Sequence, residues 1–326
     1  MLEDGYNLLS KQCAKYKNNN DKGGEMRQSL SRRLIFWAKS KRSKSIGIYV
    51  AKASLWLHTK NDNSDNTQSS KSFEIPFTDN DWDKAFSVIA SHFSNAQLFI
   101  TLGVGRYQLI QTDKPQVPDS EMTQALQWSI KDLVNLPPAN VHLDYFHSPV
   151  DNSGKINVVA LEHNEMKRLA IAAKKSGLTI RGVSIEELVL SNMPPLGSST
   201  HSQSRLIICH QSGGDLLLAV IKNNELHLQR RVRGFHALNA MSKDDLTYGG
   251  AENISLEIQR SMDFYESQLR QAPIHAIDIL VENVAEHLVP LLGKNFSQPI
   301  NIVTHSNVSE FLATLAFAEM QREAKS

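Results

Sequence analysis

A pattern of two hydrophobic strands joined by a turn of small residues occurs twice in this chain. The first copy covers residues 45–58 and the second covers residues 205–221. Short apolar runs bounded by turn residues are typical of β-hairpins, and the backbone N–H groups of such a tight loop can bind a phosphate. Two such hairpins facing each other across a cleft predict a two-lobed chain with room for a nucleotide between the lobes.

The chain lacks several residues that a metal ion and a nucleotide would need at such a site. A nucleotide site of this kind also needs a carboxylate at the end of each first strand to position Mg²⁺ and water, but these positions hold Tyr49 and His210. A later strand, residues 276–281, runs into a segment without the glycine that would let the chain pack on a nucleotide. The candidates for a degenerate nucleotide cleft lie in the two turns: Lys52, Ser54, Gly213, Gly214 and Asp215. We therefore expect no catalytic residue, no metal ligand and no cofactor, with Mg²⁺ and ATP as the alternative.

Composition excludes several classes of protein. With 326 residues, of which 41% are hydrophobic and 21% charged, the chain is long enough to form two hydrophobic cores. Its 35 basic and 34 acidic residues give a net charge of +1, which argues against a nucleic-acid partner. No apolar run approaches the roughly 18 residues of a spanning helix, and the first 22 residues do not form a signal peptide. The two cysteines, Cys13 and Cys209, fit a reducing compartment, so we expect a cytoplasmic protein.

Changes in composition divide the chain. Alternating strand-like and helix-like segments predict α/β layers. We expect a basic, polar extension over residues 1–45 and a first lobe over residues 46–190, into which a subdomain of about residues 96–180 is inserted. A linker rich in Pro, Ser and Thr covers residues 191–204, and a second lobe covers residues 205–326.

The extension carries seven basic residues and no acidic residue between residues 27 and 44, and Met26 is a candidate for the true start. Leu30, Leu34 and Trp37 share one face at helical spacing, which suits a helix on an anionic membrane surface. A solvated, frayed tail is the equally weighted alternative. The expected membrane-surface residues are Arg32, Arg33, Trp37, Lys41 and Arg42.

Three stretches carry a resemblance to a known family. Residues 257–269 read Glu-Ile-Gln-Arg-Ser-Met-Asp-Phe-Tyr-Glu-Ser-Gln-Leu, residues 125–133 read Ala-Leu-Gln-Trp-Ser-Ile-Lys-Asp-Leu, and residues 141–145 read Val-His-Leu-Asp-Tyr. Together with the double hairpin and the order of elements, they resemble the PilM family of actin-like pilus-assembly proteins. The most similar branch is the MshI proteins of the mannose-sensitive haemagglutinin (MSHA) pilus system. The resemblance covers roughly residues 46–320. It implies an actin-like ATPase (RNase H-like) fold of two lobes, with a small α+β subdomain inserted in the first.

The resemblance also implies a function. It indicates a cytoplasmic platform beneath the inner-membrane complex of a type IV pilus, which binds the amino-terminal cytoplasmic tail of a PilN-like membrane protein beside the inserted subdomain. A contact with the pilus assembly ATPase is a further expectation. The residues that we expect to bind the partner are Arg106, Tyr107, Leu126 and Trp128. Because the metal carboxylates are missing, we expect a catalytically silent adaptor.

Two alternatives remain open. An actin-like ATPase or phosphotransferase would use Asp215 and Glu282 in place of the missing carboxylates, although Asp215 lies beyond the turn rather than at the strand end. The basic run at residues 230–233 is typical of a contact with an acidic partner or a membrane, and equally of a sheet edge that is protected against aggregation.

Overall fold

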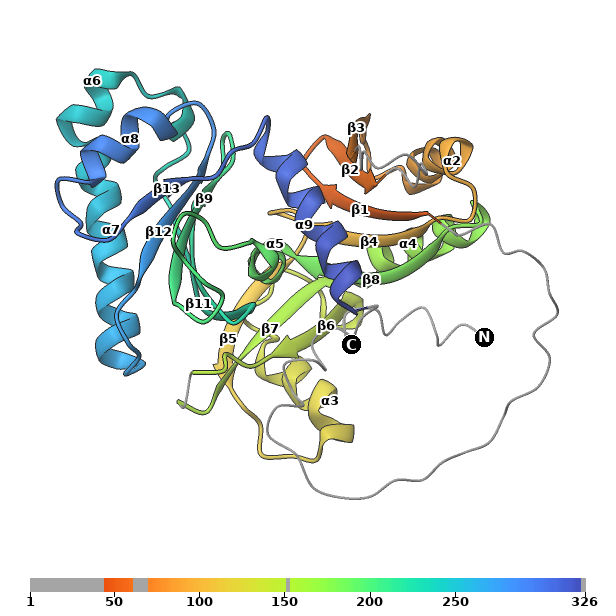
Figure 1. The fold of residues 1–326 in the computed structure, drawn as a ribbon. Coiled ribbons are helices and arrows are strands. Elements are labelled where there is room, and N and C mark those ends of the chain that lie inside the picture. Colours follow the sequence, from red (N-terminus) through yellow and green to blue (C-terminus); the bar gives the residue numbers. More distant parts are fainter. Residues whose placement is uncertain (1–43, 61–69, 151–152, 324–326) are drawn as a thin grey trace.

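The computed structural model describes residues 44–60, 70–150 and 153–323. Two five-stranded sheets with equivalent strand orders form its framework (Figure 1). The first sheet has the order β3-β2-β1-β4-β8, with β1 (Ser45–Val50), β2 (Ser54–Lys60), β3 (Ser70–Pro76), β4 (Gln97–Leu102) and β8 (Thr179–Ile185). The second has the order β11-β10-β9-β12-β13, with β9 (Arg205–His210), β10 (Leu216–Lys222), β11 (Glu225–Val232), β12 (Ala276–Val281) and β13 (Ile300–Ile302).

Both sheets begin with three antiparallel strands, and the first strand then pairs in parallel with a later one. The two expected hairpins are β1–β2 and β9–β10, so the repeated pattern of the sequence corresponds to a repeated topology. Residues 61–72 are rich in Asn, Asp and Ser, a composition that predicts a surface loop. Residues 61–69 lie outside the described part, and Ser70–Ser72 begin β3. This strand is short of buried residues because it is the edge strand of its sheet.

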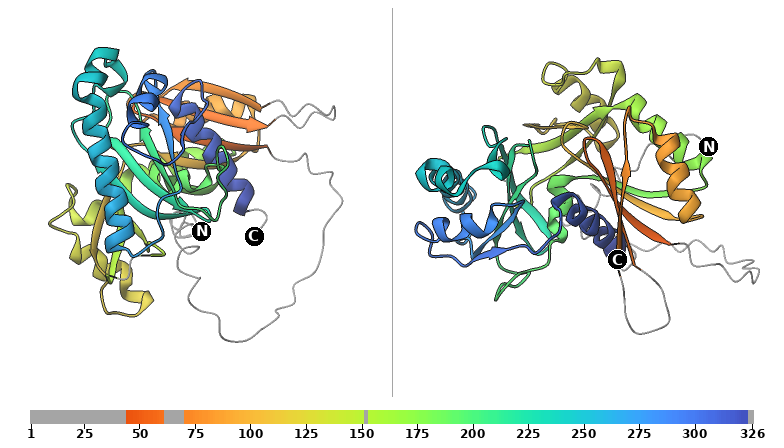
Figure 2. Two further views of the ribbon diagram at one scale, coloured as in Figure 1. Left: turned by 60° about the vertical axis from the view of Figure 1, so that its left-hand side comes forward. Right: turned by 90° about the horizontal axis from the view of Figure 1, so that it is seen from above.

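The first sheet is covered on both faces (Figure 2). Helices α2 (Trp82–His92) and α4 (His163–Lys175) pack against each other on one side, and α9 (Val308–Glu323) packs along β1 and β2 on the other. The last helix of the chain therefore returns to the sheet formed by the first strands. Gly47 lets α9 approach closely, because a Cβ atom there would lie 2.2 Å from the backbone nitrogen of Phe317.

A three-stranded antiparallel sheet is inserted between β4 and β8. Its order is β5-β7-β6, with β5 (Gln108–Asp113), β6 (Val141–Phe146) and β7 (Lys155–Glu162), and α3 (Asp119–Ser129) packs on it through its own small core. The expected range of 96–180 for the insertion extends over β4, α4 and the start of β8, which belong to the first lobe. Strand-helix alternation alone does not distinguish these elements, because they continue the same pattern.

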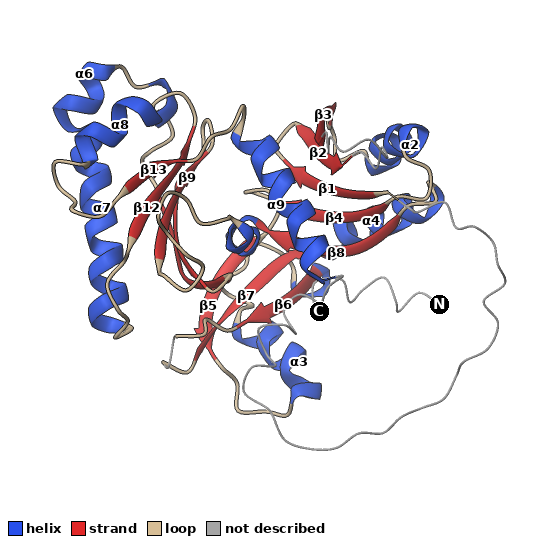
Figure 3. Cartoon of the chain, viewed as in Figure 1, coloured by secondary structure: helices blue, strands red, loops and turns tan. Residues whose placement is uncertain are grey.

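The second sheet separates two cores. Along β9, Leu206 and Ile208 contact the apolar residues of the second lobe, whereas Ile207 and Cys209 belong to a core that continues into the first lobe. This alternation follows from the two faces of a strand. Helices α6 (Lys243–Asp245), α7 (Ala251–Asp263) and α8 (Ala285–Leu292) belong to the second lobe (Figure 3).

The chain also contains several short helical segments. Helix α5 (Glu186–Val189) follows β8 and leads into the segment between the lobes. The 3₁₀ turns are Pro138–Asn140, Leu190–Asn192 and Leu238–Ala240, and the π-helical turns are Leu246–Gly250 and Phe264–Gln268. Within the described residues, no helix combines the length and the apolar character required to cross a lipid bilayer.

Candidate functional site

The two hairpins meet at a small cavity between the lobes. The cavity has a volume of about 150 Å³ and is lined by residues from both turns and from α5 and β11. Four of the predicted cleft residues line it, namely Lys52, Gly213, Gly214 and Asp215. The fifth, Ser54, accepts a hydrogen bond at its backbone oxygen from the Ala51 N–H and is not among the described lining residues.

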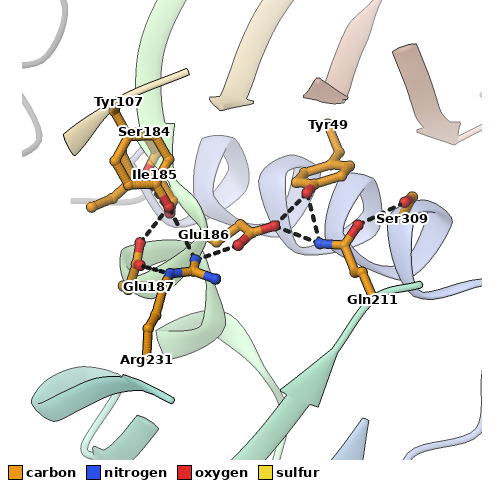
Figure 4. A network of polar contacts seen from close by, with 9 residues as sticks. All are labelled: Tyr49, Tyr107, Ser184, Ile185, Glu186, Glu187, Gln211, Arg231 and Ser309. Carbon is orange, nitrogen blue, oxygen red and sulfur yellow. Dashed lines mark hydrogen bonds and ion pairs between the residues drawn. The ribbon is translucent and has the colours of Figure 1, made fainter. Parts of the chain in front are cut away.

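A polar network crosses this cavity (Figure 4). Tyr49 occupies the position on β1 where a metal-binding site would have a carboxylate. Its hydroxyl donates a hydrogen bond to Glu186 on α5. Gln211 follows β9, and its Nε2 donates both to Glu186 and to the Tyr49 hydroxyl, the latter over 2.7 Å. The Ser309 hydroxyl on α9 donates to Oε1 of Gln211 over 3.1 Å. These four side chains therefore join β1, α5, the end of β9 and α9.

Arg231 extends the network toward the inserted subdomain. Its Nε donates to Oε1 of Glu187 over 2.7 Å, and one terminal nitrogen donates to Glu186 and, over 3.2 Å, to the Tyr107 hydroxyl. The Tyr107 hydroxyl in turn donates to Oε2 of Glu187 over 2.6 Å. One arginine of the second lobe thus binds two adjacent carboxylates that follow the first sheet, and a tyrosine that precedes β5.

Burial makes the network strongly coupled. Glu186 and Glu187 are 2% and 0% exposed. Burial, followed by the negative charge of Glu186, raises the pKa of Tyr49 well above its ordinary value, and burial with Glu187 does the same for Tyr107. Both phenols therefore stay protonated and act as donors. Burial lowers the pKa of Arg231, but the negative charges of Glu187 and Glu186 outweigh it and raise the pKa overall, so the guanidinium remains charged.

The cavity that the network crosses is small. Ligand pockets usually enclose about 300–1,000 Å³, and this cavity encloses about 150 Å³. The side chains of Tyr49 and Gln211 hydrogen-bond to each other where the ends of the two hairpins meet. His210 stabilises the turn between β9 and β10, because its Nε2 hydrogen-bonds to the Gly214 carbonyl oxygen over 3.2 Å.

The two carboxylates considered as substitutes have other contacts. Asp215 lies 3.7 Å from Nε2 of His236, and Glu282 accepts a hydrogen bond from the Val308 N–H at the start of α9. Asp215 lines the cavity, whereas Glu282 is not among its described lining residues. In the described part of the chain, no group of three or more His, Cys, Asp or Glu side chains is arranged to hold a metal ion.

The predicted partner-binding residues differ widely in exposure. Leu126 is fully buried in the core of the inserted subdomain, and Tyr107 belongs to the network. Arg106 donates to the Ala51 carbonyl and to Asn80, and its guanidinium stacks 4.8 Å from the centre of the Phe77 ring. Trp128, on α3, is 67% exposed and is the member of this set that is free to contact a partner.

The expected membrane-surface residues lie outside the described part of the chain, as does Met26. They are Arg32, Arg33, Trp37, Lys41 and Arg42. Their role stays a prediction.

Of the side chains in this network, the sequence analysis singled out Tyr49, in place of a metal carboxylate, and Tyr107, as a partner-binding residue, but not Glu186, Glu187, Gln211 or Ser309. Two signals were present. Glu186 and Glu187 directly follow a buried strand, where paired carboxylates need a partner. Arg231 belongs to the basic run at residues 230–233, and its contacts with these carboxylates account for one charge of that run.

Comparison with solved structures identifies the fold. The PilM-PilN type IV pilus biogenesis complex aligns over 86% of this chain and 98% of that chain, with 14% sequence identity and a TM-score of 0.55. A protein of unknown function from Bacteroides thetaiotaomicron, described as having an actin-like ATPase fold, aligns over 84% and 96%, with 11% identity and a TM-score of 0.50. The chain has the actin-like ATPase fold. The fold class expected from the sequence is thereby confirmed.

A third similar structure is the cytoplasmic domain of EpsL, an inner-membrane component of the type II secretion system of Vibrio cholerae. It aligns over 84% of this chain and 94% of that chain, with 13% identity and a TM-score of 0.49. No family model matches the sequence, and no curated protein matches it.

Proposed function

We propose that this protein is a non-catalytic scaffold of type IV pilus assembly, of the MSHA type, at the cytoplasmic face of the inner membrane. The observation that carries the proposal is the network between the lobes. It joins Tyr49, Glu186, Gln211 and Arg231 between the two hairpins, where the sequence predicts room for a nucleotide. In this proposal, the actin-like fold provides surfaces that bind partner proteins and does not provide a catalytic site.

The partner that we propose is a PilN-like inner-membrane protein, bound through its amino-terminal cytoplasmic tail. The similar solved structure is a complex of PilM with PilN, which supports this class of partner. On this chain, α3 and the turn after it present Trp128 and Leu133, which are 67% and 56% exposed. Exposed aromatic side chains are common anchors of protein interfaces. The tail would therefore dock on the inserted subdomain.

The wider assembly is part of the same proposal. A pilus assembly ATPase would supply the energy that the scaffold does not, and the basic residues before Lys44 would hold the protein against anionic lipid. Both contacts would place the chain at the membrane periphery, with the PilN-like tail as its main attachment.

The test is a binding titration with the tail peptide of a PilN-like protein from the same cell. We expect Trp128→Ala to weaken binding by about thirtyfold, the loss of a typical interface anchor of about 2 kcal/mol. The matched control is Tyr248→Ala, because Tyr248 is an aromatic residue of the second lobe that is 86% exposed. Equal affinity of the wild type and Trp128→Ala would contradict the proposed docking site, and failure of any membrane pilus component to co-purify would contradict the function.

A further inference from the structure

A second hollow lies between the inserted subdomain and the second lobe. It is a groove of about 990 Å³, lined by β7 and the loop after β6 on one side, and by β11 and the end of α7 on the other. It lies away from Trp128, which is not among its described lining residues. Gln111 of β5 and residues 226–230 of β11 both contribute to its lining.

The groove is basic. Its lining includes four cationic side chains and, among the described residues, no carboxylate: Lys155, Arg230, Arg260 and Arg270. Glu257 is not among the lining residues, but its carboxylate oxygens lie 2.7 Å from a guanidinium nitrogen of Arg230 and 2.6 Å from one of Arg260. A single negative charge therefore pairs with two positive charges. The guanidinium side chain of Arg260 remains 56% exposed. The surface therefore has an excess of positive charge, although the whole chain is almost neutral.

The groove also borders two sheet edges. Strand β11 is the last strand of the second sheet and β5 is the last strand of the inserted sheet, and residues of both line the groove. The backbone oxygen of His227 in β11 accepts a hydrogen bond over 2.5 Å from the hydroxyl of Ser148, which also lines the groove, so a peptide would have to pair with the other backbone groups of this edge. Phe264, which is 46% exposed, adds an apolar contact. Extended peptides bind such edges through main-chain hydrogen bonds, with side-chain pockets giving specificity.

We infer that this groove binds an extended, acidic peptide segment of a partner protein. Its carboxylates would meet Lys155, Arg260 and Arg270, and its main chain would run along the edge of β11. Charge complementarity selects this occupant and excludes the basic extension of the chain itself, whose residues 27–44 carry seven positive charges and no negative charge. The site is separate from the docking site proposed on α3, so either can fail without the other.

The test uses fluorescence anisotropy with the full chain. The probe is a labelled peptide of alternating Glu and Val, and the comparison is a peptide of the same length with Lys in place of Glu. We expect the acidic peptide to bind and the basic peptide not to bind. The triple variant Lys155→Gln, Arg260→Gln, Arg270→Gln should weaken binding by about eightfold, since the loss of each exposed charge should cost roughly twofold in affinity.

The matched control removes three charges elsewhere. Lys84, Lys167 and Lys174 are exposed on α2 and α4, and the variant with all three changed to Gln should bind as the wild type does. Thermal unfolding should be similar for both variants, because Glu257 keeps Arg230 as its partner.

Three results would overturn the inference. They are no binding of the acidic peptide, equal weakening by both triple variants, and equally tight competition by a short single-stranded DNA, which would indicate a site for any polyanion. Amide hydrogen exchange gives an independent measurement: the bound peptide should slow exchange in β11, and unchanged exchange there would exclude binding along this edge.

Discussion

Arg231 is the residue on which the network between the lobes depends most. Its guanidinium is the cation that faces Glu186 and Glu187, two adjacent and almost fully buried carboxylates. A buried ion pair adds little stability compared with a well-packed apolar pair, but removal of one partner leaves uncompensated buried charge.

We expect Arg231→Met to lower the free energy of unfolding by about 3 kcal/mol. Urea denaturation measures this change, and Arg233→Met is the matched control because Arg233 is exposed immediately beyond the same strand. The additional change Glu187→Gln should restore part of the loss, since it removes one of the two carboxylates. A loss below about 0.5 kcal/mol, the usual size of a surface substitution, would contradict the assigned role.

His227 makes the stability sensitive to acid. Burial, and then the positive charge of Lys222, lower its pKa to about 4, and its Nδ1 lies 3.0 Å from the Tyr265 hydroxyl. The unfolded chain has a histidine pKa of about 6.5 and binds the proton more readily. The stability that the neutral side chain contributes is therefore complete above about pH 6.5 and is lost as the pH falls toward 4.

The shift corresponds to roughly 3 kcal/mol between these pH values. His227→Gln should remove this part of the pH dependence, because glutamine does not titrate and can still face Tyr265. Free energies of unfolding at neutral and acidic pH measure the difference, with the exposed His92→Gln as control. If His227→Gln loses as much stability in acid as the wild type, the assignment is wrong.

At the scale of elements, the approach of α9 to the first sheet depends on Gly47. A Cβ atom at this position would lie 2.2 Å from the Phe317 nitrogen and 2.4 Å from the Ala313 carbonyl oxygen, both in the helix backbone. Because backbone cannot rotate away, a side chain here must displace the whole helix.

Gly47→Ala should destabilise the protein by about 3 kcal/mol, at the upper end of the usual cost of overpacking. Gly293→Ala is the control, since Gly293 has φ near −61° and its nearest neighbour to an added Cβ is 3.4 Å away. Thermal and urea unfolding of both variants measure the costs. Similar stability of the two would mean that α9 does not pack on β1 as described.

Elements with a regular apolar pattern could be predicted from the sequence. The spacing of Trp82, Phe86 and Ile89 predicts the helix that is found at Trp82–His92, and both hairpins lie where the turn residues indicate. Strand β3 was missed because it is an edge strand with no fully buried residue. The turn after β12 lacks glycine, as noted from the sequence, and Asn283 adopts the left-handed conformation there instead, with φ of 65°.

The cleft was only partly predictable. The sequence indicates which carboxylates are missing, because those positions follow from the strand pattern. It does not indicate what replaces them, since the replacement joins side chains from β1, α5, the end of β9, β11 and α9. Such contacts depend on the packing of distant elements and have no local signal in the chain.

At the scale of the whole molecule, one of the hydrophobic cores extends across both lobes. Ile207, Cys209 and Leu217 of the second sheet belong to the same buried cluster as residues of the first sheet and of α9. Lobes joined by a large apolar interface are not expected to open and close freely. The shared core and the polar network therefore both favour one fixed arrangement, which suits a scaffold better than a nucleotide-driven switch.

Whether the cleft still binds a nucleotide is tested most simply by thermal unfolding of the full chain with and without Mg²⁺-ATP, beside a nucleotide-binding actin-like protein as positive control. We predict no change in the unfolding temperature of this protein, because its own side chains hydrogen-bond to one another across the cleft. A ligand at about one hundred times its Kd would stabilise the folded state by roughly 2.7 kcal/mol. A concentration-dependent rise in unfolding temperature with Mg²⁺-ATP would contradict the account.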